Sequence, residues 1–193
     1  MTDSLSPEAV EPRLRGRFGR PYEYVDSTPS TQLLLLPDAP EGALVAAGEQ
    51  TAGRGRLGRR WLALAGTSLL CSLQLRPAIA SERLPELTGV AARACAEAVA
   101  ALTGLELELK FPNDVLVGGR KLAGVLAEAR EERVVLGIGV NVNVTAEELP
   151  QEVDRPATSI LVETGRELDR AELLAELLER LERRYDDWLS GAR

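Results

Sequence analysis

Apolar residues recur at every third or fourth position in two long segments of the chain, which is the period of an amphipathic helix. The first segment runs from Glu82 to Thr103 and is followed by Gly104, so a helix that ends at this glycine is predicted. The second segment predicts a long helix over 169–189, with Asp169 as its N-cap. Its apolar stripe consists of Leu173, Leu174, Leu177, Leu178, Leu181, Tyr185 and Trp188.

Shorter segments have the apolar content or the two-residue alternation of β-strands. Strands are predicted over 42–49, 68–76, 105–110, 115–117, 121–129 and 133–144. Pro112 lies beyond the end of the third, and the pair Gly118-Gly119 between the fourth and fifth predicts a hairpin turn. Because strands joined by such turns pair antiparallel, we predict an α+β fold with a mixed, mainly antiparallel sheet packed against helices.

The N-terminal part of the chain has no clear period. Residues 1–21 are rich in Pro, Glu and Arg, and we expect an N-terminal arm that is mobile or loosely attached to a single domain over 22–193. Further on, Ser30 and Thr31 precede a leucine run that stops at Pro37, which predicts a short helix with a hydroxyl cap.

Composition narrows the class of protein. The chain has 193 residues with 45% hydrophobic content, which is enough for one sizeable core. Its formal net charge of −7 disfavours a protein that coats DNA or an anionic membrane, so neither is an expected partner. No apolar run reaches the length of a membrane span and the N-terminus does not look like a signal peptide, so we expect a cytoplasmic protein.

The absence of histidine limits the available chemistry. Ser-His-Asp, Cys-His and His-ligated zinc sites are excluded, and lysine, arginine and the carboxylates remain for catalysis. Cys71 and Cys95 lie in apolar surroundings without the spacing of metal ligands, which predicts buried free thiols.

Positive charge is concentrated in one short stretch of this acidic chain. Gly53 to Trp61 contains three glycines and four arginines, and it lies between two predicted strands. Glycine lets backbone N–H groups approach a ligand closely, and each guanidinium matches phosphate or carboxylate oxygens, so this loop predicts an anion site. A second stretch pairs Lys110 with Asn113 and Asp114, whose oxygens suit Mg²⁺ as well as an ordinary turn.

In order and spacing, these stretches resemble the signature of the biotin protein ligases. The elements are Gln50 to Arg56, Trp61, Lys110 to Asp114, Arg120 to Gly124, Gly139 to Asn141, and Ser30 to Gln32. Each element alone is weak, but several in the correct order are specific, and the resemblance covers roughly residues 22–190. It implies a biotin/lipoate protein ligase-like catalytic domain, without an N-terminal DNA-binding domain or a C-terminal β-barrel cap.

The resemblance also implies an activity. Biotin is activated by ATP, with Mg²⁺, to biotinyl-5'-AMP, and is then transferred to a lysine of a biotin carboxyl carrier protein. The implied catalytic residues are Lys121, Arg54 and Arg56. On the biotin side, the implied residues are Ser30, Thr31, Gln50, Gly53, Arg54, Arg56, Lys121 and Gly124. On the nucleotide side, they are Arg54, Arg56, Trp61, Lys110, Asn113, Asp114, Lys121 and Asn141, with Asp114 as the metal ligand.

Resemblance further implies that the glycine-arginine loop closes as a flap over the adenylate, which water would otherwise hydrolyse. Trp61 packs either beside the ligand or in the core. The sequence departs from the family at Phe111, where Trp is usual, and at Gln32, where Asn is usual. Because of the second departure, Ser27 and Thr28 remain an alternative to Ser30 and Thr31.

Other functions of the same superfamily remain possible at this point. A lipoate or octanoate ligase or transferase shares the fold and a comparable lysine, but a fatty acyl chain needs an apolar tunnel rather than polar partners such as Gln50. A non-catalytic biotin sensor would not need Lys121, Asn113 and Asp114. By analogy, and from the hairpin-rich segment 105–144, we also expect a homodimer formed through sheet edges.

Overall fold

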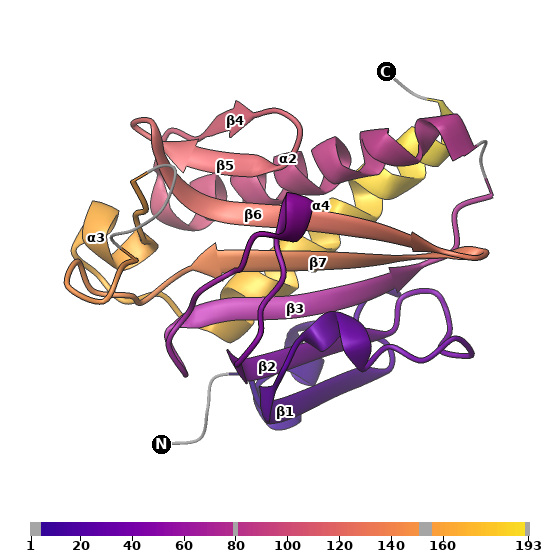
Figure 1. Ribbon diagram of the computed structural model, residues 1–193, viewed down its shortest axis with the longest axis horizontal. Helices are drawn as coiled ribbons and strands as arrows, with labels where there is room; N and C mark the ends of the chain where they lie inside the picture. The colour runs from indigo at the N-terminus through magenta and orange to yellow at the C-terminus, as the bar shows by residue number, and fades with distance from the viewer. Residues whose placement is uncertain (1–4, 79–80, 151–155, 192–193) are drawn as a thin grey trace.

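The computed structural model describes residues 5–78, 81–150 and 156–191. Its centre is a seven-stranded sheet with the order β1-β2-β3-β7-β6-β5-β4 (Figure 1). The strands are β1 (Tyr22–Thr28), β2 (Leu44–Gln50), β3 (Ser68–Leu75), β4 (Glu108–Lys110), β5 (Asp114–Val117), β6 (Arg120–Arg130) and β7 (Arg133–Asn141). Only β1 and β2 pair parallel, and the other neighbours pair antiparallel, which confirms the predicted mixed, mainly antiparallel sheet.

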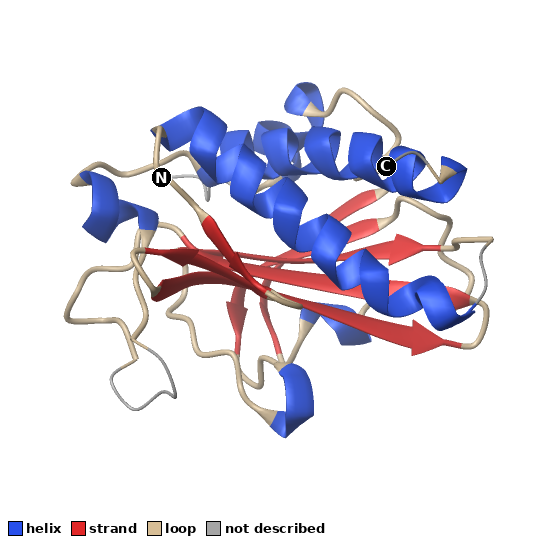
Figure 2. Ribbon diagram, turned by 90° about the horizontal axis from the view of Figure 1, so that it is seen from above, coloured by secondary structure: helices blue, strands red, loops and turns tan. Residues whose placement is uncertain are grey.

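Two long helices cover one face of the sheet, as Figure 2 shows. They are α2 (Leu84–Thr103) and α4 (Arg170–Ser190). Gly104 ends α2 with a φ of 74°, and the Asp169 side chain accepts hydrogen bonds from the first backbone N–H groups of α4, so both predicted termini are confirmed. The shorter helices are α1 (Pro7–Val10) and α3 (Ile160–Thr164), and the 3₁₀ turns are η1 (Glu11–Arg13), η2 (Thr31–Leu33), η3 (Arg56–Gly58) and η4 (Ser81–Arg83).

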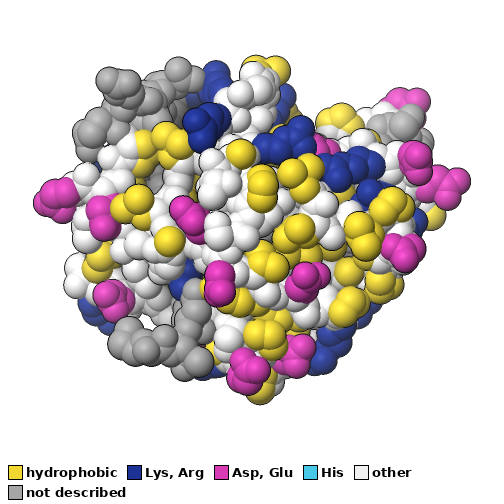
Figure 3. Space-filling model, turned by 60° about the horizontal axis from the view of Figure 1, so that its bottom comes forward, with side chains coloured by type: hydrophobic (Ala, Val, Ile, Leu, Met, Phe, Trp, Pro, Cys, Tyr) yellow, Lys and Arg dark blue, Asp and Glu magenta, His cyan; other side chains and the backbone are white. Residues whose placement is uncertain are grey.

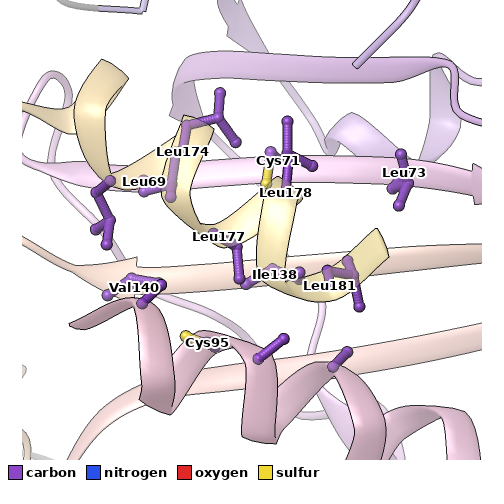
Figure 4. Close-up of a cluster of buried hydrophobic side chains, with 14 of the residues drawn as sticks. Leu69, Cys71, Leu73, Cys95, Ile138, Val140, Leu174, Leu177, Leu178 and Leu181 are labelled. Atoms are coloured by element: carbon purple, nitrogen blue, oxygen red, sulfur yellow. The ribbon is translucent and has the colours of Figure 1, made fainter. Parts of the chain in front are cut away.

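The hydrophobic core lies between the helices and the sheet. Alternate residues of β3 and β7 point toward the helices, and leucines of α4 pack onto them (Figure 4). The labelled side chains are Leu69, Cys71, Leu73, Cys95, Ile138, Val140, Leu174, Leu177, Leu178 and Leu181. Both cysteines are buried and free, as predicted, and burial raises the pKa of each thiol to about 12. The opposite face of the sheet is therefore left for other contacts.

The expectation of a loosely attached N-terminal arm is wrong for the described residues 5–20. Leu5, Val10 and Phe18 are fully or almost fully buried in the main core. Arg17 pairs with Glu182 and Asp186 of α4, and Phe18 packs against Tyr185. The sequence did not reveal this packing, because the apolar residues of the segment are widely spaced among charged ones and form no periodic pattern. Residues 1–4 of the predicted arm lie outside the described part of the chain.

Several local predictions also differ from the structure. β1 and α3 are additional elements, and the helix expected after Ser30 is a single 3₁₀ turn without a side-chain cap. The strand predicted over 105–110 is reduced to β4, while Leu105 and Leu107 pack against the core without joining the sheet. The hairpin at Gly118-Gly119 is confirmed, with positive φ at both glycines. Within the described ranges, no helix combines the length and apolar character needed to cross a membrane.

Candidate active site

A cavity of about 530 Å³ opens on the sheet face opposite α2 and α4. The flap, defined as residues 53–61 between β2 and β3, crosses this face (Figure 1). Twelve of the thirteen residues implied by the resemblance line the cavity: Ser30, Thr31, Gln50, Arg54, Arg56, Trp61, Lys110, Asn113, Asp114, Lys121, Gly124 and Asn141. The thirteenth, Gly53, lines the adjoining hollow under the flap. The structure thus gathers residues from six separate segments of sequence.

The floor of this cavity consists of two adjacent rows of residues. Each row runs across the sheet and is formed by residues that lie opposite one another on neighbouring strands. In one row, Ser72 of β3 lies opposite Gly137 of β7. In the next, Gly139 of β7 lies opposite Gly124 of β6, which lies opposite Asp114 of β5. The glycines allow close approach, because a Cβ atom at Gly139 would lie 2.6 Å from Trp61 Cε2 and one at Gly137 would lie 2.6 Å from Gln32 Nε2.

The first row carries neutral polar groups. The backbone N–H of Thr31 donates to Gln50 Oε1 at 2.8 Å, and the Thr31 hydroxyl lies 2.7 Å from the Ser72 hydroxyl. Ser30 and Thr31 are each 2% exposed and line the cavity, whereas Ser27 is exposed and bonds to Glu49. The structure therefore favours the pair Ser30 and Thr31 over Ser27 and Thr28.

The charged groups lie at the end of the second row, around Asp114. Lys121 Nζ lies 2.7 Å from Asp114 Oδ1 and 5.7 Å from the centre of the Trp61 ring. The Asn113 amide donates to Asp114 and accepts a 3.4 Å hydrogen bond from Arg56 of the flap. Two cations and a carboxylate are thus collected at one end of the cavity, with the neutral hydroxyls at the other.

The flap is folded as a small hairpin. Gly55 N–H donates to Arg59 O, and Trp61 N–H donates to Gly53 O. A Cβ atom at Gly53 would lie 2.5 Å from Trp61 O, so this position requires glycine. Trp61 folds back from the hairpin onto the glycine floor, and its side chain therefore lies in the cavity lining rather than in the main core.

Lys110 and Asn141 also line the cavity. Lys110 is exposed at the end of β4. Asn141 is buried, and its Nδ2 donates to Thr158 O at 2.9 Å. This bond uses one of the two amide N–H groups, so the second N–H and the amide oxygen are not used by it. Lys and Arg side chains also form a row across the upper half of the face seen in Figure 3, although the chain as a whole is acidic.

Comparison with known proteins places this fold and site in a family. Residues 23–144 match the Biotin/lipoate A/B protein ligase family. The chain belongs to this family. A bifunctional ligase/repressor BirA of Bacillus spizizenii is 40% identical over 182 residues, which cover 90% of this chain and 56% of the relative. The chain therefore spans little more than half the length of that relative.

The chain covers a larger share of two further members of the family. The biotin--[acetyl-CoA-carboxylase] ligase of Mycobacterium tuberculosis is 38% identical over 201 residues, covering 96% of this chain and 74% of the relative. The biotin protein ligase from Aquifex aeolicus, solved in complex with biotin and ATP, has a TM-score of 0.80 at 34% identity and covers 88% of this chain and 72% of that one.

The ligase-family site contains residues that the motifs did not predict. Ser72, Gly137 and Leu126 line the cavity, and Glu128 lies beneath the flap. The alternation Gly137-Ile138-Gly139 was an available signal, because glycines two apart on a strand mark one face open to close approach. Ser72 and Glu128 carried no such signal, since only the strand register brings them to the site.

Unsatisfied polar atoms mark the same cavity. Among the described residues, Gln32 Oε1 and Trp61 Nε1 are buried without a hydrogen-bond partner, and both side chains line the cavity. An acceptor and a donor left unpaired in this way have a free-energy cost that a polar ligand would relieve.

The donor set fits a magnesium ion only together with a substrate. The described residues contain no cluster of three or more acidic, cysteine or histidine ligands. Asp114 contributes one carboxylate, and Lys121 already occupies its Oδ1. Mg²⁺ commonly binds through one or two carboxylates and the phosphates of a nucleotide, so Asp114 and the Asn113 oxygen suit an ion that arrives with ATP.

Proposed function

We propose that this chain activates biotin with ATP to biotinyl-5'-AMP and transfers biotin to a lysine of a biotin carboxyl carrier protein. The observation that carries the proposal is the polarity of the cavity. Neutral hydrogen-bonding groups of Thr31, Gln50 and Ser72 lie over one row of the floor, while Lys121 and Arg56 lie toward the next. Biotin has the same polarity, with a neutral ureido ring at one end and a carboxylate at the other.

In the first step, a biotin carboxylate oxygen attacks the α-phosphorus of ATP, and pyrophosphate leaves. Two anions must meet in this step, so fixed cations aimed at the reacting oxygens lower the barrier. Lys121 is held in place by Asp114 and by the Trp61 ring, and Arg56 is held by Asn113. Lys110, Asn113 and Asn141 are proposed to contact the nucleotide, and Mg²⁺ bound with ATP through Asp114 would neutralise phosphate charge.

In the second step, the acceptor lysine amine attacks the acyl carbon, and AMP leaves. The mixed anhydride must be kept from water until the carrier arrives. The flap lies over the cavity, and Trp61 closes onto Gly124 and Gly139 beneath it. Ser30, Gly53 and Gly124 are proposed to line the biotin side, where small side chains leave room for the bicyclic ring.

The proposal is tested with the purified chain, ATP, Mg²⁺ and labelled biotin. We expect formation of biotinyl-AMP and pyrophosphate, followed by labelling of an added biotin carboxyl carrier domain. A carrier domain whose acceptor lysine is replaced by arginine serves as the matched control. Pyrophosphate exchange that depends on lipoate or octanoate but not on biotin would assign the chain to the other branch of the family. Biotin binding without ATP turnover would make it a sensor.

A cytoplasmic location and a homodimer belong to the same proposal. The location is supported by the two free, buried cysteines, which suit a reducing compartment. The acceptor is proposed to be the biotin carrier of a carboxylase, in keeping with the name of the Mycobacterium tuberculosis relative.

A further inference from the structure

Glu128 of β6 lies between two arginines from different parts of the chain. Arg54 of the flap meets its carboxylate in a bidentate arrangement, with Nη1 at 3.1 Å from Oε2 and Nη2 at 2.9 Å from Oε1. Arg130 of the same strand donates to Oε2 at 2.8 Å. The Glu128 side chain is 22% exposed and that of Arg54 is 46% exposed, so the carboxylate is half-buried while the guanidinium lies at the surface of the flap.

The same network continues to the segment that carries the biotin-side hydroxyls. Arg130 Nη1 donates to the backbone carbonyl of Gln32 at 3.1 Å, and Gln32 Nε2 donates to Leu126 O at 3.0 Å. Leu126, Glu128 and Arg130 alternate along β6 and therefore share the open face of the sheet with Gly124. One carboxylate thus joins the flap on one side of the cavity to the Ser30–Leu33 segment on the other.

We propose that Glu128 is a positioning residue that latches the flap closed through Arg54, and that this retains the acyl-adenylate until the acceptor lysine arrives. The resemblance implies catalytic roles for both Arg54 and Arg56, whereas the geometry indicates different roles for the two residues. Arg54 has its guanidinium paired with Glu128. Arg56 reaches Asn113 at the charged end of the cavity and remains the flap cation for the phosphates.

The latch predicts a defined effect of Glu128→Gln, which keeps the shape of the side chain and removes its charge. The flap contains trypsin sites at Arg54, Arg56, Arg59 and Arg60. Because proteolysis follows the population of the open state, we expect cleavage within 54–60 of the free protein to become about five- to tenfold faster, with little change elsewhere in the chain. Glu132→Gln, in the exposed turn after β6, is the matched control and should leave the cleavage rate unchanged.

A second readout rests on the proposed function. In Glu128→Gln and in Arg54→Gln, preformed biotinyl-AMP should dissociate about tenfold faster, and serum albumin should become labelled as an off-target acceptor. In Glu128→Gln, the single-turnover rate of adenylate formation should stay within about twofold of wild type, because the reacting cations are untouched. The double variant should be no worse than either single variant, since both remove the same contact.

The outcomes separate the two proposals. Unchanged flap cleavage and adenylate release in Glu128→Gln would overturn the latch, as would equal acceleration of cleavage along the whole chain, which indicates a merely structural role. A large drop in the single-turnover rate for Arg54→Gln, with normal retention, would make Arg54 a reacting cation and also overturn it. If wild type forms no biotinyl-AMP, the proposed function fails, while the cleavage experiment still decides whether the latch exists.

Discussion

Lys121 is fixed by its neighbours before any substrate binds. Asp114 holds its ammonium group by an ion pair, and the Trp61 ring lies alongside it. Its backbone is fixed as well, because its N–H donates to Pro156 O and its carbonyl accepts from Thr158 N–H. A cation whose side chain and backbone are both held in place needs little rearrangement as charge develops at a phosphoryl centre. Most of the effect of this residue should therefore appear in the rate rather than in stability.

We predict that Lys121→Ala slows biotinyl-AMP formation by a factor on the order of 10²–10³, the usual cost of removing one preorganised charge. The free energy of unfolding should change by no more than about 1 kcal/mol, because the ion pair is partly exposed. Single-turnover kinetics and urea unfolding measure the two effects. Arg120→Ala, which removes a neighbouring exposed ion pair with Glu163, is the matched control and should affect neither strongly. Parallel losses of rate and stability in Lys121→Ala would contradict a catalytic role.

At this scale, the residues that carry a distinctive chemistry could be identified from the sequence. The ordered motifs named thirteen residues, among them lysines, arginines and an Asn-Asp pair, and twelve of the thirteen line one cavity. Glu128 could not be identified, because an isolated glutamate on a strand looks like any solvated surface residue. Its importance depends on Arg54 and Arg130 meeting it, and that depends on how the flap folds across β6.

Among the elements, the N-terminal segment shows what hydrophobic periodicity misses. α1 and η1 are too short to complete an amphipathic pattern, yet Val10 of α1 and the nearby Leu5, Leu14 and Phe18 belong to the core. β1 was missed for a related reason: its burial does not alternate, because it is an edge strand paired only with β2. The two long helices and the β5–β6 hairpin were predictable, since each carries a full period and its own turn or cap residues.

Because the N-terminal segment is part of the core, truncating its buried Phe18 side chain should destabilise the protein. Phe18 is 1% exposed and its ring lies 5.6 Å from that of Tyr185. We predict that Phe18→Ala lowers the free energy of unfolding by about 3–5 kcal/mol, the usual range for a buried aromatic residue. Urea unfolding provides the measurement, and Arg15→Ala in the same segment should change stability by less than about 0.5 kcal/mol. A loss below about 1 kcal/mol for Phe18→Ala would indicate that the segment is detached in solution.

For the whole molecule, the layered arrangement separates stability from function. The helices cover one face of the sheet (Figures 1 and 2). The glycine floor, the flap and the charged groups lie at the cavity on the other face. Substitutions in the helix layer should therefore alter stability with little effect on ligand contacts, and substitutions over the floor should do the reverse. The sequence predicted the two layers, but the pairing of β3 with β7, which places Ser72 beside Gly137, depends on contacts far apart in the chain.

Among the described strands, β1 and β4 form the two edges of the sheet. The segment 105–144, from which a dimer was expected, contributes one edge strand, β4, whose three residues are all exposed. The other edge is β1, with seven residues. We predict a homodimer formed through one of these edges, so that light scattering gives twice the 20.8 kDa mass of one chain. A mass that stays at the monomer value up to high micromolar concentration would contradict this prediction.

The chain contains only two lysines, Lys110 and Lys121, and both line the cavity. An amine-acylating reagent applied to the folded chain therefore finds its side-chain targets in the cavity itself, with the N-terminal amine as the remaining target. Substrates that fill the cavity should shield these two amines from the reagent. The extent of acylation, measured by mass spectrometry, would then report how much of the protein has its cavity filled by substrate, without an attached label.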